Sequence, residues 1–349
     1  MRLEAREHVP LWMTALAPPI AVAVSFLFCA ILILWAGASP LSAYGDLIAG
    51  ALGSRFAITE TLVRATPLIF TGLAVAVAFR AKLWNIGGEG QLYAGALMVT
   101  WVGTGAVDLP PILMIPFLFL SAAAAGGLLL LGPALMKTYL KADEVVTTLL
   151  LNFVVLLLVN YLLFGPWKDP MAMGWPQGAA IIDNGLLEGL VPKARVHMGL
   201  IYALCAAVLV FIMMRFTIWG FEIRAVGHNA EAARFAGMPM TWTTVRTALI
   251  SGGLAACAGV TEVAGTKGYL TADISPGFGY TGIAVAMLAG LNPLGVIVSA
   301  IFIAAIYNGA DAMSRSIDVS NYIADVITAT SLLLVLAAVA LSRYRLKRG

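Results

Sequence analysis

Long apolar runs recur along this chain, and they restrict it to a helical fold inside a membrane. A spanning helix needs about 20 mostly apolar residues to cross the hydrocarbon core of a bilayer. Of the 349 residues, 61% are hydrophobic and only 11% are charged, whereas soluble domains carry about 25% charged residues. A β-barrel would show short alternating segments instead. The sequence therefore predicts an all-α fold, a polytopic helical bundle of an inner membrane.

Ten segments are apolar enough to be candidate spans, and the segment 280–291 is the only one too short to cross alone. If both chain ends lie inside the cell, cytoplasmic segments hold twice as many of the 21 Lys and Arg residues as external ones, as the positive-inside rule favours. We therefore expect about ten transmembrane helices with both termini cytoplasmic. The candidate spans are 12–36, 62–79, 88–107, 112–136, 144–165, 197–216, 244–262, 280–291, 293–310 and 323–342.

The segment 220–239 separates two apolar spans and carries the signals of a short helix of its own. Asn229 is a favourable N-cap, and Glu231 falls in the first turn. Gly237 can take the left-handed position after the helix, with Pro239 just beyond. A two-turn helix is marginal alone in water, so it needs a surface to pack on. That surface is either a soluble partner that drives motion, or this protein and the lipid headgroups.

A polar, glycine-rich stretch interrupts the apolar sequence at residues 85–91 and contains Glu89. A charge at mid-membrane costs about 2.5–3.5 kcal/mol on insertion scales, so such groups mostly line a water-filled path or pair inside a bundle. Two interpretations stay open. The stretch is either a broken helix that lines a permeation path or an ordinary cytoplasmic turn beside Arg80 and Lys82.

Other polar residues also lie in apolar surroundings. Asn152 and Asn160 are about two helical turns apart, so they either face a pathway or bond to a neighbouring helix. Asn292 lies in a polar break after the run 281–287, which is similar to the run 71–77 that precedes the first break. Interrupted helices in corresponding places are typical of transport sites. The candidate substrate-pathway residues are Asn85, Glu89, Gln91, Asn152 and Asn292.

No pattern in the sequence supports catalysis or a metal site. The three histidines are far apart, without an H-E-x-x-H pattern, and no G-x-x-x-x-G-K-[ST] phosphate loop is present. The run 249–253 superficially resembles the signature loop of ATP-binding cassettes, but it lies in an apolar span, where small residues favour close helix packing. No basic patch is interleaved with aromatics, which argues against nucleic-acid binding. We expect no enzymatic activity, no metal and no cofactor in this chain.

Three motifs together resemble the permeases of ABC importers for simple sugars, nucleosides and branched-chain amino acids. The run 224–238, RAVGHNAEAARFAGM, is similar to the cytoplasmic loop of that family, with His228 where Gly is common. The runs 79–91 and 142–152 resemble the nucleoside and simple-sugar branch. The similarity extends over roughly residues 60–340.

The resemblance implies that residues 1–349 are a single transmembrane permease domain of a bacterial inner (plasma) membrane, with a cytoplasmic coupling loop at 217–243. It implies a cytoplasmic ABC ATPase that binds ATP and Mg²⁺, a distinct second permease subunit that makes a heterodimer, and an external binding protein that delivers a small-molecule substrate. The ATPase would close on ATP and move residues 222–238, which act as the coupling helix, and membrane lipid would surround the spans. The residues implied in this coupling are Glu222, Arg224, Gly227, Asn229, Glu231, Ala232, Ala233, Arg234, Phe235 and Gly237.

Two other functions are consistent with a polytopic fold. A stand-alone secondary transporter or facilitator for a small polar solute would suit the interrupted helices equally well. It would need ionisable residues at mid-membrane for ion coupling, and these are scarce here. A membrane enzyme would need a nucleophile or a metal site, and the sequence suggests neither.

Overall fold

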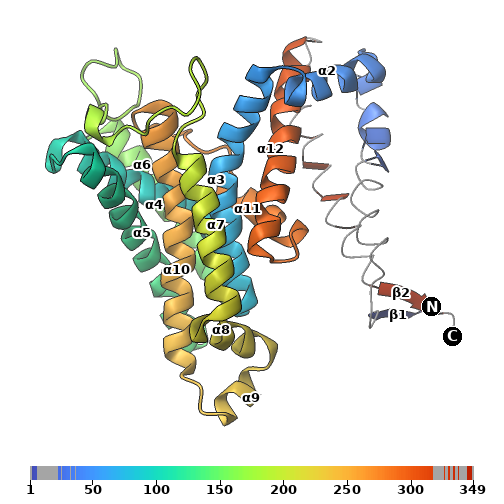
Figure 1. The fold of residues 1–349 in the computed structure, drawn as a ribbon, viewed down its shortest axis with the longest axis vertical. Helices are drawn as coiled ribbons and strands as arrows, with labels where there is room; N and C mark the ends of the chain where they lie inside the picture. Colours follow the sequence, from blue (N-terminus) through green and yellow to red (C-terminus); the bar gives the residue numbers. More distant parts are fainter. Residues whose placement is uncertain are drawn as a thin grey trace. The chain divides into compact units, whose positions relative to one another are not determined.

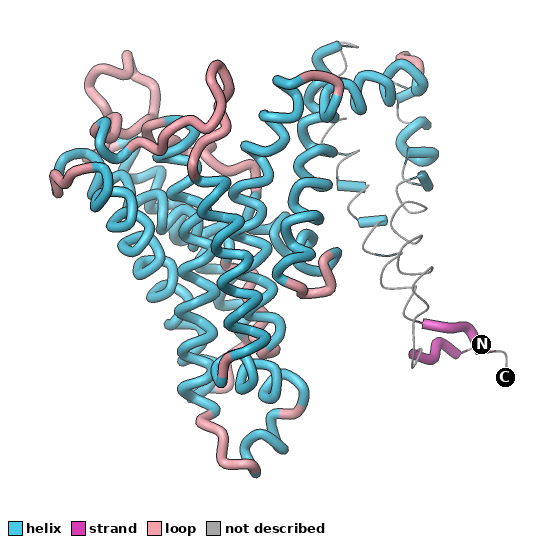
Figure 2. The backbone as a smooth tube through the Cα atoms, viewed as in Figure 1, coloured by secondary structure: helices cyan, strands magenta, loops and turns pink. Residues whose placement is uncertain are grey.

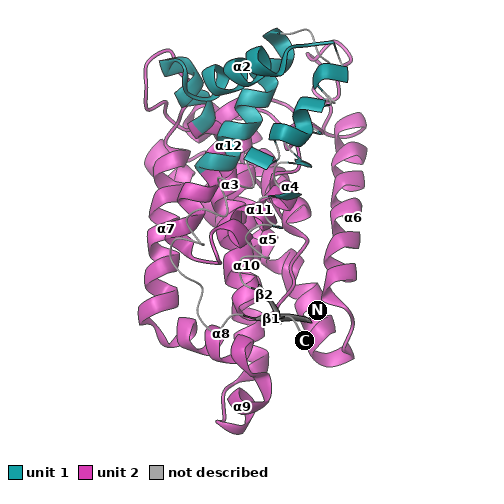
Figure 3. Cartoon of the chain, turned by 90° about the vertical axis from the view of Figure 1, so that its right-hand side faces the viewer, with its two compact units in different colours: residues 1–61, 301–349 teal, residues 62–300 magenta. Residues whose placement is uncertain are grey.

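A computed structural model describes residues 37–316 of the chain continuously, together with 2–5, 23–24, 26–31, 33–35, 326, 329–330, 333–334, 337 and 344–347. These residues form two compact units (Figure 3). The first unit comprises residues 1–61 and 301–349, and the second comprises 62–300. The candidate spans 12–36 and 323–342 lie mostly outside the described residues.

The regular elements of the described chain are helices joined by loops, the longest of which runs between α6 and α7 (Figures 1 and 2). The strands of the described chain form a two-stranded antiparallel ladder in the first unit, in which Arg2 of β1 is opposite Lys347 of β2. The all-α prediction therefore holds for the helical bundle but missed this ladder. The elements are β1 (Arg2–Ala5), α2 (Pro40–Leu52), α3 (Arg55–Arg80), α4 (Gly88–Trp101), α5 (Pro111–Leu135), α6 (Glu144–Phe164), α7 (Gly199–Phe216), α8 (Ile218–His228), α9 (Ala230–Phe235), α10 (Met240–Val260), α11 (Phe278–Leu288), α12 (Pro293–Ser316) and β2 (Tyr344–Lys347).

Several helices begin where the sequence supplies a cap. The Asp143 side chain accepts a hydrogen bond of 2.8 Å from the Val145 N–H at the start of α6. The Thr217 hydroxyl accepts one of 3.2 Å from the Gly220 N–H at the start of α8. These side chains satisfy backbone donors that have no partner inside the helix.

Six described helices are long and apolar enough to cross a membrane, and a bent pair in the first unit would make a seventh. This is fewer than the ten predicted spans. The segment 280–291 forms α11, which is only 11 residues long. The segment 88–107 forms the 14-residue α4 and a π-helical turn at 102–106, where Gly105 has a φ of 102°. The six are Arg55–Arg80, Pro111–Leu140, Glu144–Phe164, Gly199–Phe216, Met240–Lys267 and Pro293–Ser316.

Glycine contacts hold α4, α5 and α10 close together in the second unit. A Cβ added to Gly252 of α10 would lie 2.2 Å from the Gly126 carbonyl of α5. A Cβ on Gly95 of α4 would lie 2.2 Å from the Ala256 carbonyl of α10. Small residues let helix backbones approach in this way. The structure thus confirms the interpretation of residues 249–253 as a helix-packing segment.

The two similar runs 71–77 and 281–287 lie against each other. A Cβ on Gly282 would be 2.7 Å from the Thr71 side chain, and a Cβ on Gly72 would be 2.7 Å from Val285. The sequence similarity thus corresponds to a direct contact between α3 and α11.

In the first unit, α2, the start of α3 and the end of α12 surround one buried amide. Asn308 Nδ2 donates to the carbonyls of Gly50 and Ala57 at 3.0 and 3.2 Å and lies 3.3 Å from Thr61 Oγ1. An apolar cluster beside it includes Leu47, Ala310 and Met313. Polar and apolar contacts together fix α2 on its neighbours in this unit.

Candidate functional site

The short helix that the sequence predicts is present as α9, and its ends are built as expected. Asn229 Oδ1 accepts hydrogen bonds of 3.0 Å from the Glu231 and Ala232 N–H groups. Gly237 has a φ of 76°, and the following Met238 N–H donates to the Ala233 carbonyl at 3.0 Å. These contacts are an N-cap and a left-handed glycine C-terminus. The prediction of a capped helix is confirmed.

The predicted coupling segment 222–238 is two helices rather than one. Asn229 has a β-region backbone (φ −151°, ψ 103°), so α8 ends at His228 and α9 starts at Ala230. The sequence signals for α9 were local, whereas the separate helix α8 was not anticipated.

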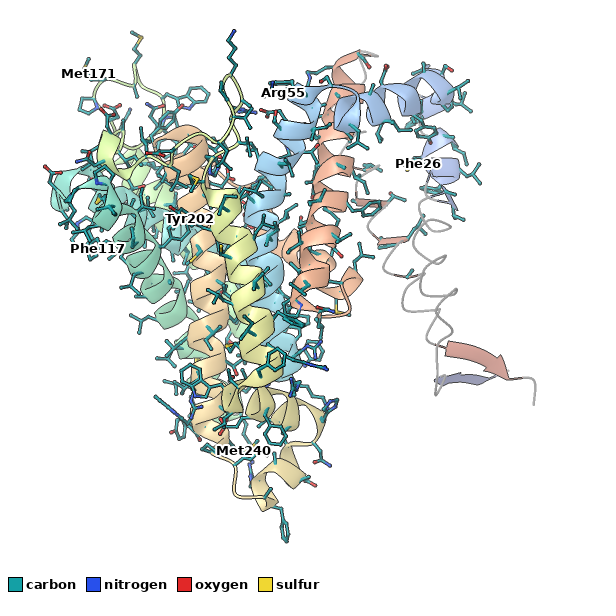
Figure 4. The ribbon with its side chains drawn as sticks, viewed as in Figure 1. Phe26, Arg55, Phe117, Met171, Tyr202 and Met240 are labelled. Carbon is teal, nitrogen blue, oxygen red and sulfur yellow. The ribbon has the colours of Figure 1, made fainter. Side chains whose placement is uncertain are left out.

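The two helices at this end of the second unit differ in exposure. In α9, Phe235 is 97% exposed and Ala233 only 4%. Helix α8 is packed inward through Ile223, Val226 and Gly227. In Figure 4, Met240 marks the start of α10 at this end, and Met171 lies in the long loop at the opposite end of the unit. Helix α9 therefore exposes a phenyl ring at its surface, while α8 ties it to the bundle.

An arginine clamp joins α8 to α10. Arg246 of α10 forms a 3.0 Å ion pair with Glu222 of α8. Its guanidinium carbon lies 5.4 Å from the ring centre of Trp219 and 5.3 Å from that of Trp242. Cation–π contacts of this kind are worth ~0.5–1 kcal/mol each at exposed sites. The Glu222 carboxylate also lies 3.4 Å from the Thr243 hydroxyl.

Helix α8 also contacts the end of α3. A Cβ added to Gly227 would lie 1.8 Å from the Arg80 carbonyl, so only glycine allows this approach. Arg224 donates through Nη1 to the Met214 carbonyl of α7. Three of the coupling residues that the resemblance named, Glu222, Arg224 and Gly227, thus attach α8 to neighbouring helices.

Three of the predicted pathway residues gather in a buried hydrogen-bond network at the start of α4. Asn85 and Gln91 exchange two hydrogen bonds of 2.9 Å between their side-chain amides. Asn85 Nδ2 also lies 3.1 Å from the Ser251 hydroxyl, which donates to the Ala74 carbonyl at 2.8 Å. Asn152 Oδ1 accepts from the Gly90 N–H at 2.8 Å, and its Nδ2 donates to the Ile86 carbonyl at 2.9 Å.

This network gives the 85–91 stretch its non-helical shape. Buried backbone groups outside a helix need partners, and Asn152 and Asn85 supply them: Asn85 Oδ1 also accepts from the Gly87 N–H at 2.9 Å. Asn85, Gln91 and Asn152 are at most 2% exposed. Ser251 belongs to the network as well, and sequence reasoning missed it because a single serine among glycines gave no polar pattern.

Glu89, the fourth predicted residue, lies between two helix starts. Its Oε2 accepts a 2.7 Å hydrogen bond from the Gly279 N–H in the first turn of α11, and Glu89 itself is in the first turn of α4. The Gly277 N–H donates to the nearby Ser275 hydroxyl at 3.2 Å. A negative charge is favourable at the positive end of a helix dipole. Tyr93 lies nearby and donates to the Ala272 carbonyl at 2.7 Å.

Asn292, the fifth predicted residue, lies apart from the other four. It caps α12, since its Oδ1 accepts from the Leu294 N–H at 3.1 Å. It lines a cavity of about 310 Å³ together with arginines of three other elements. Metal ligation finds no support in the part of the chain that the structure describes, where no three His, Cys, Asp or Glu side chains group together.

Comparison of the chain with known protein families shows the class of protein to which it belongs. The family described as "Branched-chain amino acid transport system / permease component" matches residues 57–338. This chain belongs to that permease family. The permease shares 36% identity with the glucose ABC transporter permease protein TsgB13 of Haloferax volcanii over 355 residues, which cover 99% of this chain and 93% of that protein.

Two further relatives carry names from nucleoside transport. The guanosine ABC transporter permease protein NupP of Bacillus subtilis is 36% identical over 328 residues, 93% of this chain and 94% of that protein. The nucleoside ABC transporter permease protein NupB of Lactococcus lactis is 32% identical over 308 residues, 86% and 85% of the two chains. The permease is therefore a membrane translocation subunit of an ABC transporter and not an enzyme.

Proposed function

We propose that this permease forms the translocation path of an ATP-driven importer for nucleosides or related simple sugars. The relatives named for guanosine, nucleoside and glucose transport support this substrate class. The runs 79–91 and 142–152, which resemble the nucleoside and simple-sugar branch, fit either substrate class. Asn85, Glu89, Gln91, Asn152 and Asn292 remain the candidate path residues. The first four act there by holding the broken helix at 85–91 in shape, since their side-chain atoms are engaged in hydrogen bonds.

The observation that carries the ATP-driven mechanism is the exposure of Phe235 on α9. A phenyl ring that is 97% exposed at the tip of a capped helix offers apolar surface that a partner can bury with a gain in free energy. Helix α8 then transmits movement of α9 through the Glu222–Arg246 pair to α10. The partner at this end is a cytoplasmic ABC ATPase, which holds ATP and Mg²⁺. The coupling set is Glu222, Arg224, Gly227, Asn229, Glu231, Ala232, Ala233, Arg234, Phe235 and Gly237.

Docking of a cytoplasmic ATPase at α9 also implies which end of the permease faces the cytoplasm. The α8–α9 end of the second unit faces the cytoplasm of a bacterial cell, with both termini on that side and about ten spans in all, and residues 1–349 act as one permease domain. An external binding protein delivers the solute at the other end. A second, distinct permease subunit completes the path, as the resemblance implies.

Replacement of Phe235 tests the coupling assignment. Phe235→Asp should abolish stimulation of the ATPase and solute uptake, because it removes the apolar contact without touching the fold. Phe235→Leu keeps an apolar side chain and is the matched control, and it should retain most of the uptake. Ala233 is a poorer test position, since it is buried and a bulky side chain there would distort α9. Wild-type uptake by the Phe235→Asp variant would refute the docking assignment.

Reconstitution separates the importer from the alternative of a stand-alone secondary transporter. Proteoliposomes that contain the permease, its second permease subunit, the ATPase and the binding protein should accumulate labelled guanosine only with ATP. Labelled ribose and glucose in parallel vesicles would rank the substrates. Accumulation by this chain alone, without ATP, would instead favour a secondary transporter.

A further inference from the structure

A group of basic side chains without ion pairs in the described chain lines two neighbouring hollows at the α8–α9 end of the second unit. The first hollow, of about 310 Å³, is lined by Arg80, Arg215 and Arg224. The second, of about 320 Å³, shares Arg80 and Arg224 and adds Lys82 and His228. None of the residues that line either hollow is acidic.

Two of the arginines are held in place by backbone carbonyls. Arg80 Nε donates to the Leu291 carbonyl at 3.0 Å. Arg224 donates through Nη1 to the Met214 carbonyl. A guanidinium carries five N–H donors in a fixed planar fork, so each arginine keeps several donors for another acceptor. The carbonyl contacts therefore orient the two groups without neutralising them.

The three arginines have no counter-ion among the described residues. Across the described residues, no carboxylate forms an ion pair with Arg80, Arg215 or Arg224, whereas other cations at the same end are paired. Arg246 pairs with Glu222 at 3.0 Å, and Lys137 pairs with Glu144 at 2.5 Å. Like charges that share a partly shielded cavity repel one another, so the three arginines need an anion from outside the chain.

The surroundings of the first hollow indicate where that anion comes from. Phe211 and Met214 of α7 form part of its wall. Helix α7 is a candidate span with only 28% of its most apolar stretch buried in the chain, and Leu209 and Phe216 are 65% and 73% exposed. The arginines thus lie at the end of an apolar helix face, where a membrane changes from acyl chains to headgroups.

We propose that Arg80, Arg215 and Arg224 bind the phosphate of an anionic phospholipid headgroup, with an acyl chain along the exposed face of α7. A phosphate oxygen suits the guanidinium fork, which binds such groups in a bidentate manner. The bound headgroup would join α3, α7 and α8, the three helices that carry these arginines, and so steady the attachment of α8 to the bundle. The first hollow also includes Asn292, a candidate path residue, but the arginines do not touch the network of Asn85, Gln91 and Asn152, and the lipid site does not depend on which solute is carried.

Lipid binding by the full-length permease tests the site. The purified protein in nanodiscs or detergent is titrated with phosphatidylglycerol and, separately, with phosphatidylcholine of the same chains, and the bound lipid is counted by native mass spectrometry. We expect a preference for phosphatidylglycerol that falls about fivefold when Arg215→Gln removes one charge near the membrane surface. Arg215→Lys keeps the charge and should keep most of the preference. Arg215 makes no hydrogen bond within the described chain, so the fold should survive, and thermal unfolding checks this.

A matched variant controls for non-specific attraction. Arg234→Gln removes the same charge from exposed α9, outside both hollows, and should leave the lipid preference unchanged. Inorganic phosphate is the second probe. If it binds with the same dependence on Arg215 while phosphatidylglycerol binds no better than phosphatidylcholine, the site takes free phosphate and the lipid assignment is wrong. Equal lipid binding by wild type and Arg215→Gln would also overturn the lipid assignment. So would an Arg215→Gln variant that binds lipid normally but no longer docks the ATPase, because the arginines would then bind an acidic protein partner.

Discussion

The carboxylate of Glu89 accepts a hydrogen bond of 2.7 Å from the backbone N–H of Gly279. The two residues come from the first turns of two short helices, α4 and α11, and neither helix is long enough to count as a span. A Cβ on Gly279 would lie 2.1 Å from the Glu89 nitrogen, so the backbones touch. One carboxylate thus lies at the positive ends of two helices. Half-helices whose N-termini meet are characteristic of transporter interiors.

We predict that Glu89→Ala destabilises the permease markedly. The change leaves the buried Gly279 N–H without its acceptor, which costs about 1–3 kcal/mol. Glu89→Gln retains a carbonyl oxygen and should cost less. Thermal unfolding in detergent measures both. An unchanged midpoint for Glu89→Ala would mean that another group replaces the carboxylate.

We predict that Asn152 acts on structure rather than by direct contact with solute. Asn152→Leu would leave the Gly90 N–H and the Ile86 carbonyl unpaired, at about 1–3 kcal/mol for each buried group. The unfolding midpoint should therefore fall. Asn160→Leu is the matched control, because Asn160 bonds only to the Leu156 carbonyl one turn away on its own helix. A direct substrate contact would instead raise the KM of uptake with an unchanged midpoint.

Local signals in the sequence predicted α9 well, because a cap and a terminal glycine act within one or two turns. Asn229 and Gly237 have the roles that their residue types suggest. The signals did not tell which side of α9 is buried: Ala233 packs inward and Phe235 outward, and two turns are too short to show a periodicity. The partner of Glu89 was also not predictable, since Gly279 is 190 residues away and contributes only a backbone N–H.

The breaks inside the apolar segments could not be predicted either. Hydropathy treats 88–107 and 280–291 as continuous apolar segments. The structure breaks the first with a π-helical turn and ends the second after 11 residues. Such breaks depend on distant partners for the freed backbone groups, and apolar content alone does not contain that information.

We predict a small loss of stability at low pH that arises from Asp273, at the loop end of the second unit. Asp273 lies outside the candidate spans, and its pKa is lowered first by a hydrogen bond from Thr271 and also by Lys267, which is 3.3 Å away. A carboxyl whose pKa is lower in the folded than in the unfolded protein stabilises the fold at pH values above its unfolded-state pKa of about 4. This stabilisation is lost as the pH falls from about 4 through the folded-state pKa. Because Asp273 is largely exposed, the effect should stay below about 1 kcal/mol.

The measurement is the unfolding midpoint of wild type and Asp273→Asn between pH 3 and pH 6. The wild type should be slightly more stable than the variant at pH 6, and the difference should shrink as the pH falls towards 3. Thr271→Val removes the first cause of the pKa shift and should reduce the difference in the same range. If the difference in unfolding midpoint between wild type and Asp273→Asn grew towards low pH, the pKa of Asp273 would not be lowered in the folded protein and the prediction would be wrong.

The Arg246 clamp gives the sharpest test of how movement passes from α8 to α10. Arg246 is fixed by Glu222 and by two tryptophan rings, so Arg246→Gln loses one ion pair and about 1–2 kcal/mol of cation–π attraction. We expect the ATPase still to dock, because Phe235 is untouched, while solute uptake per ATP hydrolysed falls severalfold. Glu222→Gln should act in the same direction, and the double variant should be no worse than the poorer single one, since both remove the same link. If both single variants keep wild-type uptake per ATP, the force passes from α8 by another route, and the contact of Gly227 with the Arg80 carbonyl of α3 becomes the next candidate.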